Sequence, residues 1–491
     1  MLFNSYEFIF LFLPFTFFIY FYLNKKRLTE LSKAFLLVSS LLFYSWWNIA
    51  YLPLILLSMV FNYALGGSLT KEREHTKVSK KQLLGIGIFG NLALLGYFKY
   101  ADFFISNLNL AAGSEIGLLH LALPLAISFF TFQQIAYLVD SYRGETKEYD
   151  FLNYGVFVTF FPQLIAGPIV HHKEMMPQFA AVRNKAINYK NIALGLFIFS
   201  LGLFKKVVIA DTFALWATHG FDKAEVLTFF EAWATSLSYT FQLYFDFSGY
   251  TDMAIGAALL FNIKLPINFN SPYKAVNIQD FWRRWHITLS RFLKDYIYIP
   301  LGGNRYGNFR TYTNLMATFL LGGLWHGAGW TFIFWGFLHG FALVIHRIYS
   351  LLGIKLPLFV GWFLTFNFVN ISWVFFRANE WEDALKVLRG MGDLSSIAIS
   401  KEFASAVNYI VPFKDLHPHL TGSAQESFVN VYTLEMLAVS FFIVLVMQNS
   451  NSYFQAFSYR YHYAFFVAFS FMIFHFLQIG SSESIFLYFN F

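Results

Sequence analysis

Residues 320–340 read LLGGLWHGAGWTFIFWGFLHG, inside a run from about Leu315 to Ile345 that has no Asp, Glu, Lys or Arg. Such a run is long enough to cross the hydrocarbon core of a membrane as a helix. His326 lies near its middle, and an ionisable side chain there is a functional candidate by default. The four glycines that flank His326 remove side-chain bulk, so another helix, an unwound turn or a ligand can approach closely.

The chemistry of imidazole suits this position. A neutral imidazole takes a proton from a hydroxyl near pH 7, whereas a carboxylate buried in lipid tends to be protonated already. His326 is therefore a candidate general base. The alternative is that His326 only bonds a carbonyl of a neighbouring helix. We expect His339 and His346, further along the run, to be structural or interfacial.

A second histidine lies in residues 279–305, QDFWRRWHITLSRFLKDYIYIPLGGNR. Large apolar residues recur at helical spacing, and the cations lie between them, which predicts one amphipathic helix at a membrane surface carrying His286. The apolar positions are Phe281, Trp285, Leu289, Phe292 and Tyr296, and the cations are Arg283, Arg284, Arg291 and Lys294. Two functions remain open for the three arginines. They could bind the phosphates of a coenzyme A thioester, or they could only attract anionic lipid headgroups.

The composition excludes a soluble globular protein. Of 491 residues, 57% are hydrophobic, 22% are aromatic and only 13% are charged. The apolar runs are too long and continuous for the strands of a membrane barrel, so we expect an all-α polytopic protein with about ten to twelve hydrophobic segments. We find no soluble domain and no internal repeat, and we treat residues 1–491 as one membrane domain. The absence of Cys excludes thiolate metal sites and an acyl-cysteine intermediate on this chain.

The first half of the chain predicts a topology. Residues 7–23 are expected to be a retained span and not a signal peptide. The loops at 24–33 and 70–81 are each net +3, and residues 34–69 between them hold two spans, so both loops should be cytoplasmic. Residues 83–100 should then cross outward and 117–139 return, joined by an outer loop at 101–115.

Residues 151–170 are expected to be re-entrant, because Pro162, Gly167 and Pro168 each interrupt a helix, although an ordinary Pro-kinked span is the alternative. Asp246, Ser248 and Asp252 follow a hydrophobic segment at 225–245 and are interpreted as caps at a helix start, with direct chemistry as the alternative. Other spans are expected at 191–211, 357–377, 431–447 and 463–480. A polar excursion at about 379–430 should begin with a short amphipathic helix that ends near Gly390.

At its motifs the chain resembles the membrane-bound O-acyltransferase (MBOAT) family, and within it the membrane component of alginate O-acetylation systems. The resemblance rests on SPYKAVNIQDFWRRWHITLSRFLKDYIYIPLGGNR and GGLWHGAGWTFIFWGFLHG, and on a set of further blocks in the same order. Those blocks are YFKYADFF, PLAISFFTFQQIAYLVDSYR, FFPQLIAGPI, LGLFKKVVIAD, FDFSGYTDMAIG and WVFFRA.

The resemblance implies helices around a central tunnel, a catalytic core at about 120–350, and catalytic roles for His326 and His286. It implies acetyl-CoA as a cytoplasmic donor substrate, with no bound cofactor or metal, and transfer toward an exported or cell-envelope polysaccharide such as alginate or peptidoglycan. The implied partners are membrane lipids and a periplasmic or membrane-anchored SGNH-type acetyltransferase, without nucleic acid, in a bacterial inner membrane.

Two alternatives remain at this point. Relatives also transfer D-alanine to teichoic acid, so another acyl group is possible. A lipid-linked sugar flippase is the alternative of another class, but such transporters often show internal repeats, and none is found here.

Overall fold

The fold is built from helices in two compact units. A computed structural model describes residues 1–71, 78–146, 150–397, 427–456 and 487, and among these residues it contains no strand. Unit 1 is formed mainly by Met1–Phe204 and Phe247–Asn268, and unit 2 by Lys205–Asp246 and Phe269–Tyr453. The all-α expectation is confirmed, whereas the single domain over 1–491 stays a prediction.

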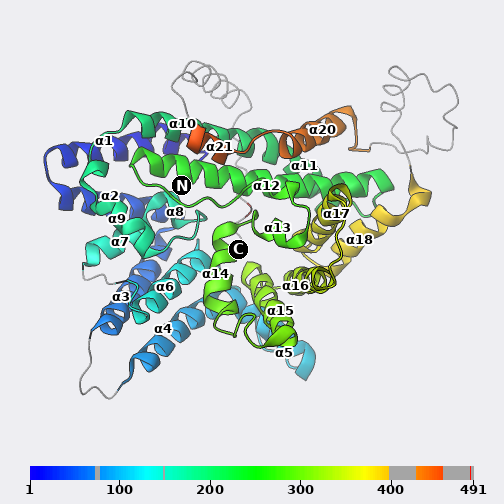
Figure 1. Cartoon of the computed structure of the whole chain (residues 1–491), viewed down its shortest axis with the longest axis horizontal. Coiled ribbons are helices and arrows are strands. Elements are labelled where there is room, and N and C mark those ends of the chain that lie inside the picture. The colour runs from blue at the N-terminus through cyan, green and yellow to red at the C-terminus, as the bar shows by residue number, and fades with distance from the viewer. Residues whose placement is uncertain (72–77, 147–149, 398–426, 457–486, 488–491) are drawn as a thin grey trace. The chain divides into compact units, whose positions relative to one another are not determined.

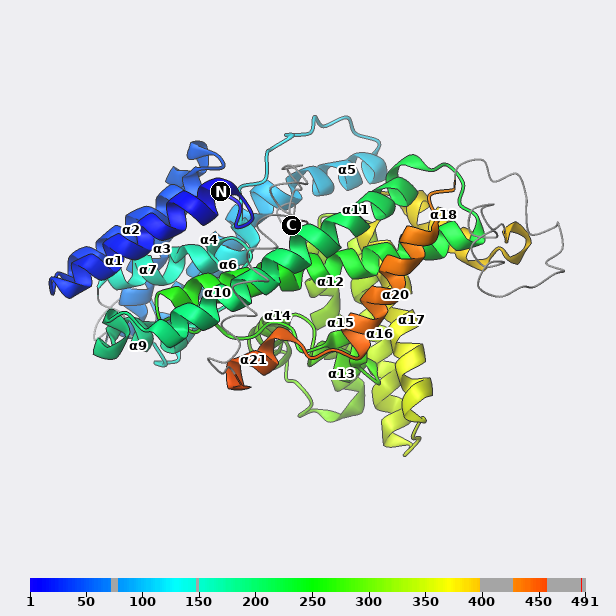
Figure 2. The ribbon, with the colours of Figure 1, turned by 90° about the horizontal axis from the view of Figure 1, so that it is seen from above.

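Unit 1 packs its helices around α6. The α1 helix packs on α2, and α3 and α4 both pack on α6, as Figures 1 and 2 show. Every side chain from Ile127 to Leu138 of α6 is buried. The helices are α1 (Leu13–Lys25), α2 (Thr29–Ser45), α3 (Leu52–Thr70), α4 (Lys80–Leu95), α5 (Ala101–Ala112), α6 (Ile127–Tyr142), α7 (Phe151–Thr159), α8 (Phe161–Leu164), α9 (His172–Ala180) and α10 (Tyr189–Phe204).

The segment predicted as an outer loop at 101–115 is helical as far as Ala112, and its position outside the membrane stays a prediction. The chain is helical without a break from Lys80 to Ala112, because apolar, helix-compatible residues continue past the end of the expected span. The expected span at 117–139 also begins too early, since α6 starts at Ile127. Pro124 lacks an N–H donor and disfavours helix in the residue before it, and Ala126 then takes a left-handed conformation at φ +61°.

Residues 151–170 form two short helices with a break at Phe160, whose ψ is 109°. The nine residues of α7 are too few to cross a membrane. The interruption expected at the prolines and glycine is therefore present. The placement of this segment as re-entrant stays a prediction.

Unit 2 contains the remaining described helices, except that α12 and α21 each continue into unit 1. The α15, α16 and α17 helices lie next to one another in chain order (Figures 1 and 2). The helices are α11 (Asp211–Thr218), the first part of α12 (Phe229–Leu260), α13 (Ile278–Trp282), α14 (Ile287–Leu293), α15 (Gly307–His326), α16 (Trp330–Leu351), α17 (Leu358–Arg377), α18 (Trp381–Gly392), α20 (Val431–Leu445) and α21 (Ser450–Ala456). The amphipathic helix expected after Ala378 is confirmed as α18, and the span expected at 463–480 lies outside the described residues.

The helix-start caps predicted near residue 250 are wrong. The α12 helix runs through this region without a break, so Asp246, Ser248 and Asp252 lie within it, and all three are buried. Asp246 forms an ion pair instead: its Oδ1 lies 2.7 Å from the Lys206 Nζ. A buried carboxylate that pairs with a cation can lie inside a helix. From the sequence alone, such a residue is instead expected at the helix start.

The protein is a multi-pass membrane protein. Among the described residues, six helical runs are long and apolar enough to cross a membrane: Glu7–Lys25, Ile49–Thr70, Lys80–Ala112, Tyr189–Lys223, Trp330–Leu351 and Leu358–Arg377. The helices expected from residues 7–23, 34–69, 191–211 and 357–377 are therefore present.

We expect the segments around Lys26 and Lys81 to be cytoplasmic. Both side chains are exposed, so cysteine can replace either of them in a chain that has no other cysteine. Lys26→Cys and Lys81→Cys should react with a membrane-impermeant maleimide only after the cells are opened. Labelling of either variant in intact cells would contradict the topology.

Candidate active site

His326 is the last residue of α15, where the helix gives way to an extended turn before α16. The backbone of Gly327 has φ −159° and ψ 151°, so the unwound turn expected beside His326 is present. The His326 side chain is 3% exposed. Its ring centroid lies 4.9 Å from that of Trp325, 5.1 Å from Trp335 and 5.0 Å from Phe376. Aromatic rings from three successive helices therefore surround this imidazole.

Two glycines fix the junction that holds His326. A Cβ atom on Gly323 of α15 would lie 2.3 Å from Phe332 O, and one on Gly336 of α16 would lie 2.3 Å from Phe319 O. Neither position has room for alanine, and the contacting atoms are backbone. The close helix approach expected from the glycines is therefore confirmed, and it is the contact that brings Trp335 against His326.

His286 lies at a break that the sequence did not predict. The single amphipathic helix expected through residues 279–296 is wrong, because α13 ends at Trp282 and α14 starts at Ile287. His286, which caps α14, has φ +43° and ψ +55°. A left-handed conformation in a residue other than glycine costs about 1–3 kcal/mol and tends to occur at functional sites. The apolar positions Phe281 and Trp285 are buried within the protein, so this segment is not simply a lipid-facing surface.

The fold brings the two histidines to a shared neighbour. The His286 ring centroid lies 6.4 Å from Trp325, and Trp325 also contacts His326. His286 is fully buried and lies outside the runs long enough to span a membrane. Burial lowers the pKa of His286 to about 3, so its imidazole is neutral near pH 7. It can therefore donate one hydrogen bond and accept another.

His339 has a different environment from the other two histidines. The Trp282 Nε1–H donates to its Nδ1 over 3.2 Å, and its Nε2 lies 3.0 Å from the Ser372 hydroxyl. That hydroxyl donates to Val369 O, so the His339 proton is on Nε2 and points at Ser372. Both ring nitrogens are engaged in joining α13, α16 and α17, which supports the structural role expected for His339.

The three arginines do not form one cluster. Arg284 Nε lies 2.8 Å from Asp280 Oδ1, and its Nη1 donates to Asn270 O, so it braces α13. Arg291 is half-buried on α14. Arg283 alone of the three lines a cavity of about 480 Å³ in unit 2.

The Arg283 cavity has a cationic part and an apolar part. Arg283, Lys294 and Arg347 supply the charge, and among the described residues that line it none is Asp or Glu. Its apolar wall includes Trp282, Phe319 and Leu343. Sequence analysis did not assign Lys294 and Arg347 to a site, although Arg347 is the first cation after the uncharged run.

Two aromatic rings, Trp282 and Trp335, lie between the Arg283 cavity and His326. The ring centroid of Trp282, which lines the cavity, is 5.9 Å from that of Trp335, and Trp335 contacts His326. Among the described residues there is also no group of three or more His, Cys, Asp or Glu that could hold a metal ion.

The fold and the site together define a helical membrane protein in which two buried histidines share one tryptophan as a neighbour. Comparison with known proteins adds the family: residues 7–379 match the family model described as MBOAT, membrane-bound O-acyltransferase family. The chain therefore belongs to the MBOAT family and is an O-acyltransferase.

Three relatives illustrate the range of this family. The chain is 50% identical to the "Peptidoglycan O-acetyltransferase" of Helicobacter pylori, over 100% of this chain and 98% of that protein. It is 42% identical to the "Probable alginate O-acetylase AlgI" of Pseudomonas aeruginosa, over 82% of this chain and 76% of that protein. It is 29% identical to the "Teichoic acid D-alanyltransferase" of Streptococcus thermophilus, over 51% of this chain and 68% of that protein.

Proposed function

We propose that this enzyme takes an acetyl group from acetyl-CoA in the cytoplasm for O-acetylation of a cell-envelope polysaccharide, with peptidoglycan as the first candidate. The observation that carries the chemistry is the buried arrangement of His286, Trp325 and His326. Ring contacts through Trp335 connect His326 to Trp282, which lines the Arg283 cavity. The choice of polymer rests on the full-length relative named for peptidoglycan. Relatives suggest two alternatives: O-acetylation of an alginate-type polymer, and transfer of D-alanine to teichoic acid.

His326 acts as the general base in this proposal. Its imidazole takes the proton of an acceptor hydroxyl as the hydroxyl oxygen attacks the thioester carbonyl. The C–S bond then breaks, and the proton returns from His326 to the departing thiolate, so the products are an ester and a free thiol. His286, which is neutral, orients a reactant or donates a hydrogen bond to the tetrahedral oxyanion.

The donor is assigned to the Arg283 cavity. The three cations there would pair with the phosphates of acetyl-CoA, since guanidinium groups bind phosphate bidentately. The apolar wall at Trp282 and Phe319 would accept the thioester arm on its way to His326. A partner transferase of the SGNH type, on the far side of an inner membrane, would pass the acetyl group to the polymer.

We expect Arg283→Gln and Arg347→Gln to raise the KM for acetyl-CoA with little change in kcat. Each removes a cation from the donor cavity and leaves His326 in place, so binding is lost more than chemistry. Steady-state kinetics at two salt concentrations measures this, and the KM of the variants should depend less on salt than that of the parent. Arg291→Gln is the matched control because Arg291 does not line the cavity. If the KM for acetyl-CoA were the same in all three variants, acetyl-CoA would not bind in this cavity.

The proposed reaction is tested with radiolabelled acetyl-CoA and purified full-length protein. Label should move to an acceptor hydroxyl, or be released as acetate, only when His326 is present. The proposal would be contradicted if the parent protein did not consume acetyl-CoA and if polymer acetylation persisted after His326→Ala substitution. If the protein consumed a D-alanyl thioester and not acetyl-CoA, this result would support the teichoic acid alternative.

A further inference from the structure

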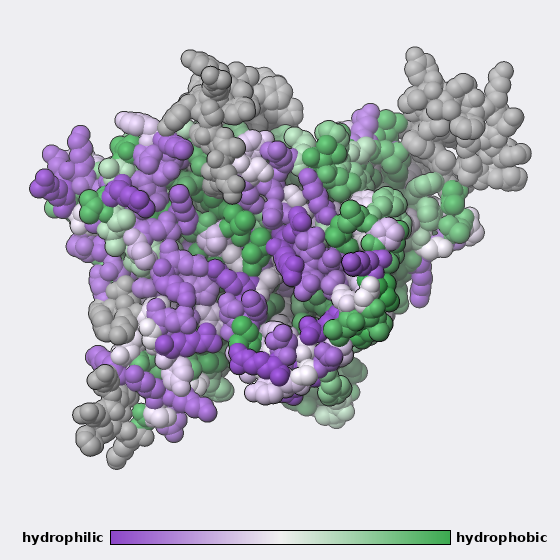
Figure 3. All heavy atoms as spheres, viewed as in Figure 1, coloured by the Kyte–Doolittle hydropathy of each residue, from purple (hydrophilic) through white to green (hydrophobic). Residues whose placement is uncertain are grey.

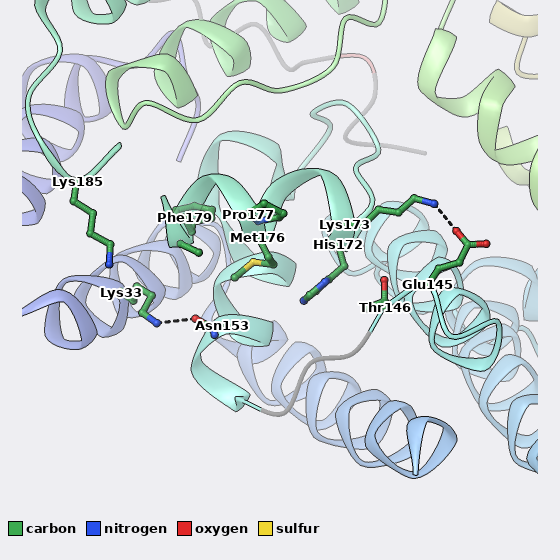
Figure 4. Close-up of a pocket in the computed structure, with 11 residues that line it drawn as sticks. Lys33, Glu145, Thr146, Asn153, His172, Lys173, Met176, Pro177, Phe179 and Lys185 are labelled. Carbon is green, nitrogen blue, oxygen red and sulfur yellow. Dashed lines mark hydrogen bonds and ion pairs between the residues drawn. The ribbon is translucent and has the colours of Figure 1, made fainter. Parts of the chain in front are cut away.

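Unit 1 contains a second cationic cavity, separate from the histidines of unit 2. This cavity, of about 420 Å³, is lined by Lys33, Lys173 and Lys185, with Glu145 as its acidic residue. Figure 4 shows Lys33 and Lys185 on one side and the Lys173–Glu145 pair on the other, with His172 between them. Nothing in the acyl-transfer mechanism uses these residues.

The polar groups of the Lys33 cavity can supply donors to an oxyanion. Lys33 Nζ donates to Asn153 Oδ1 over 2.7 Å and pairs with Glu30 at 2.9 Å. The hydrogen bond from Glu145 raises the pKa of Lys173, so this ammonium stays charged at neutral pH. Lys33 Nζ also lies 4.0 Å from Asp150 Oδ2. The acidic partners of both lysines are accessible to solvent, and such ion pairs contribute little to stability. An incoming phosphate can therefore share these lysines or replace their carboxylates.

The apolar residues near the Lys33 cavity favour a lipid over a free phosphate as its ligand. Met176, Pro177 and Phe179 form one wall of the Lys33 cavity. Lys185 also lines a second cavity of about 620 Å³, which follows the α1 helix along Phe18 and Tyr22. Val182 and Ile187, on the segment after α9, complete this second cavity and are exposed. A cationic cavity and an apolar trough therefore meet at one lysine.

The location of both cavities agrees with an amphiphilic ligand. The α1 helix belongs to a membrane-spanning run, and Lys185 lies four residues before the next such run. The face of unit 1 seen in Figure 3 is largely hydrophilic over α7 and α9, the helices that contribute Asn153 and Lys173 to the Lys33 cavity. Each lysine near a membrane surface raises the affinity for anionic lipids by about fivefold.

We propose that unit 1 holds an anionic phospholipid, with its phosphate at Lys33 and Lys185 and an acyl chain along Phe18, Tyr22 and Ile187. Lys173 adds positive charge on the other side of the Lys33 cavity. The ligand class is a phosphodiester that carries hydrocarbon chains. The site does not depend on the proposed acetyl transfer.

Native mass spectrometry of the full-length protein in detergent tests this site. Phosphatidylglycerol and phosphatidylcholine with the same acyl chains are added separately at equal concentrations. The parent should retain phosphatidylglycerol well above phosphatidylcholine. Changing Lys33, Lys173 and Lys185 together to Gln should lower phosphatidylglycerol retention at least fivefold, about the effect of one lysine, and leave phosphatidylcholine unchanged.

A charge-matched control separates the site from net charge. Lys71, Lys81 and Lys190 are exposed and line neither cavity, so changing all three to Gln removes the same charge and should leave retention as in the parent. Changing the three site lysines to Arg should also preserve binding. If the triple Gln variant cannot be purified, Lys185→Gln alone tests the point where the cavities meet.

Two outcomes would overturn the lipid assignment. Equal losses in the site and control variants would mean that phosphatidylglycerol only responds to total charge. Full displacement of phosphatidylglycerol by an equal concentration of glycerol 3-phosphate would mean that the cavity takes phosphate alone and that the apolar trough plays no part.

Discussion

His326→Ala should nearly abolish polymer acetylation while leaving expression and membrane insertion intact. Losing a general base typically costs about 100- to 10,000-fold in rate. The His326 side chain ends α15 among aromatic rings, so its removal takes away the proton acceptor. His326→Gln should fail as well, since an amide can hydrogen-bond but cannot take the proton. The measurement is ester-linked acetate on envelope polysaccharide at matched protein levels.

The control for this prediction is His339. His339→Gln can keep a hydrogen bond to Trp282 or Ser372, so it should retain much more acetylation than His326→Gln. Any loss in the His339 variant should appear as lower thermal stability of the purified protein. Substantial acetate from His326→Gln cells would instead make His326 a packing residue and would move the proton transfer elsewhere.

Lys206→Met should destabilise unit 2 by about 3–5 kcal/mol, the usual effect of breaking a buried ion pair from one side. Lys206 Nζ lies 2.8 Å from Asp211 Oδ1 and 2.7 Å from Asp246 Oδ1. The Lys206 side chain is 5% exposed and that of Asp246 is 1% exposed, so water cannot replace the lost cation at Asp246. Thermal unfolding in detergent, followed by loss of monodisperse protein, measures the effect.

A second substitution identifies the cause of that loss. Lys206→Met combined with Asp246→Asn should recover part of the stability, because the buried charge left behind is then removed. Lys223→Met is the control, since Lys223 is exposed in the same unit and should cost little. If the double variant is less stable than Lys206→Met alone, the lysine acts through its packing and not through its charge.

Much of the fold was predictable because membranes impose simple rules. A run without charges must be helical in lipid, so the helices near residues 7–25, 29–70 and 358–377 follow from composition alone. Errors arose where polar residues were interpreted locally. Asp246 was taken for a cap because the sequence does not show that Lys206, forty residues earlier, lies beside it.

The sequence by itself determined the class of protein, the helical architecture and the candidacy of His326, because hydrophobic run length and an isolated imidazole are local properties. The tertiary structure decided which residues share a site. The predicted helix is interrupted at His286, and both His286 and His326 contact Trp325. Arg283 lines the same cavity as Arg347, whereas Arg284 does not line it. Periodicity cannot predict these contacts, since a left-handed residue at 286 and the glycine contact between α15 and α16 are stable only in the packed protein.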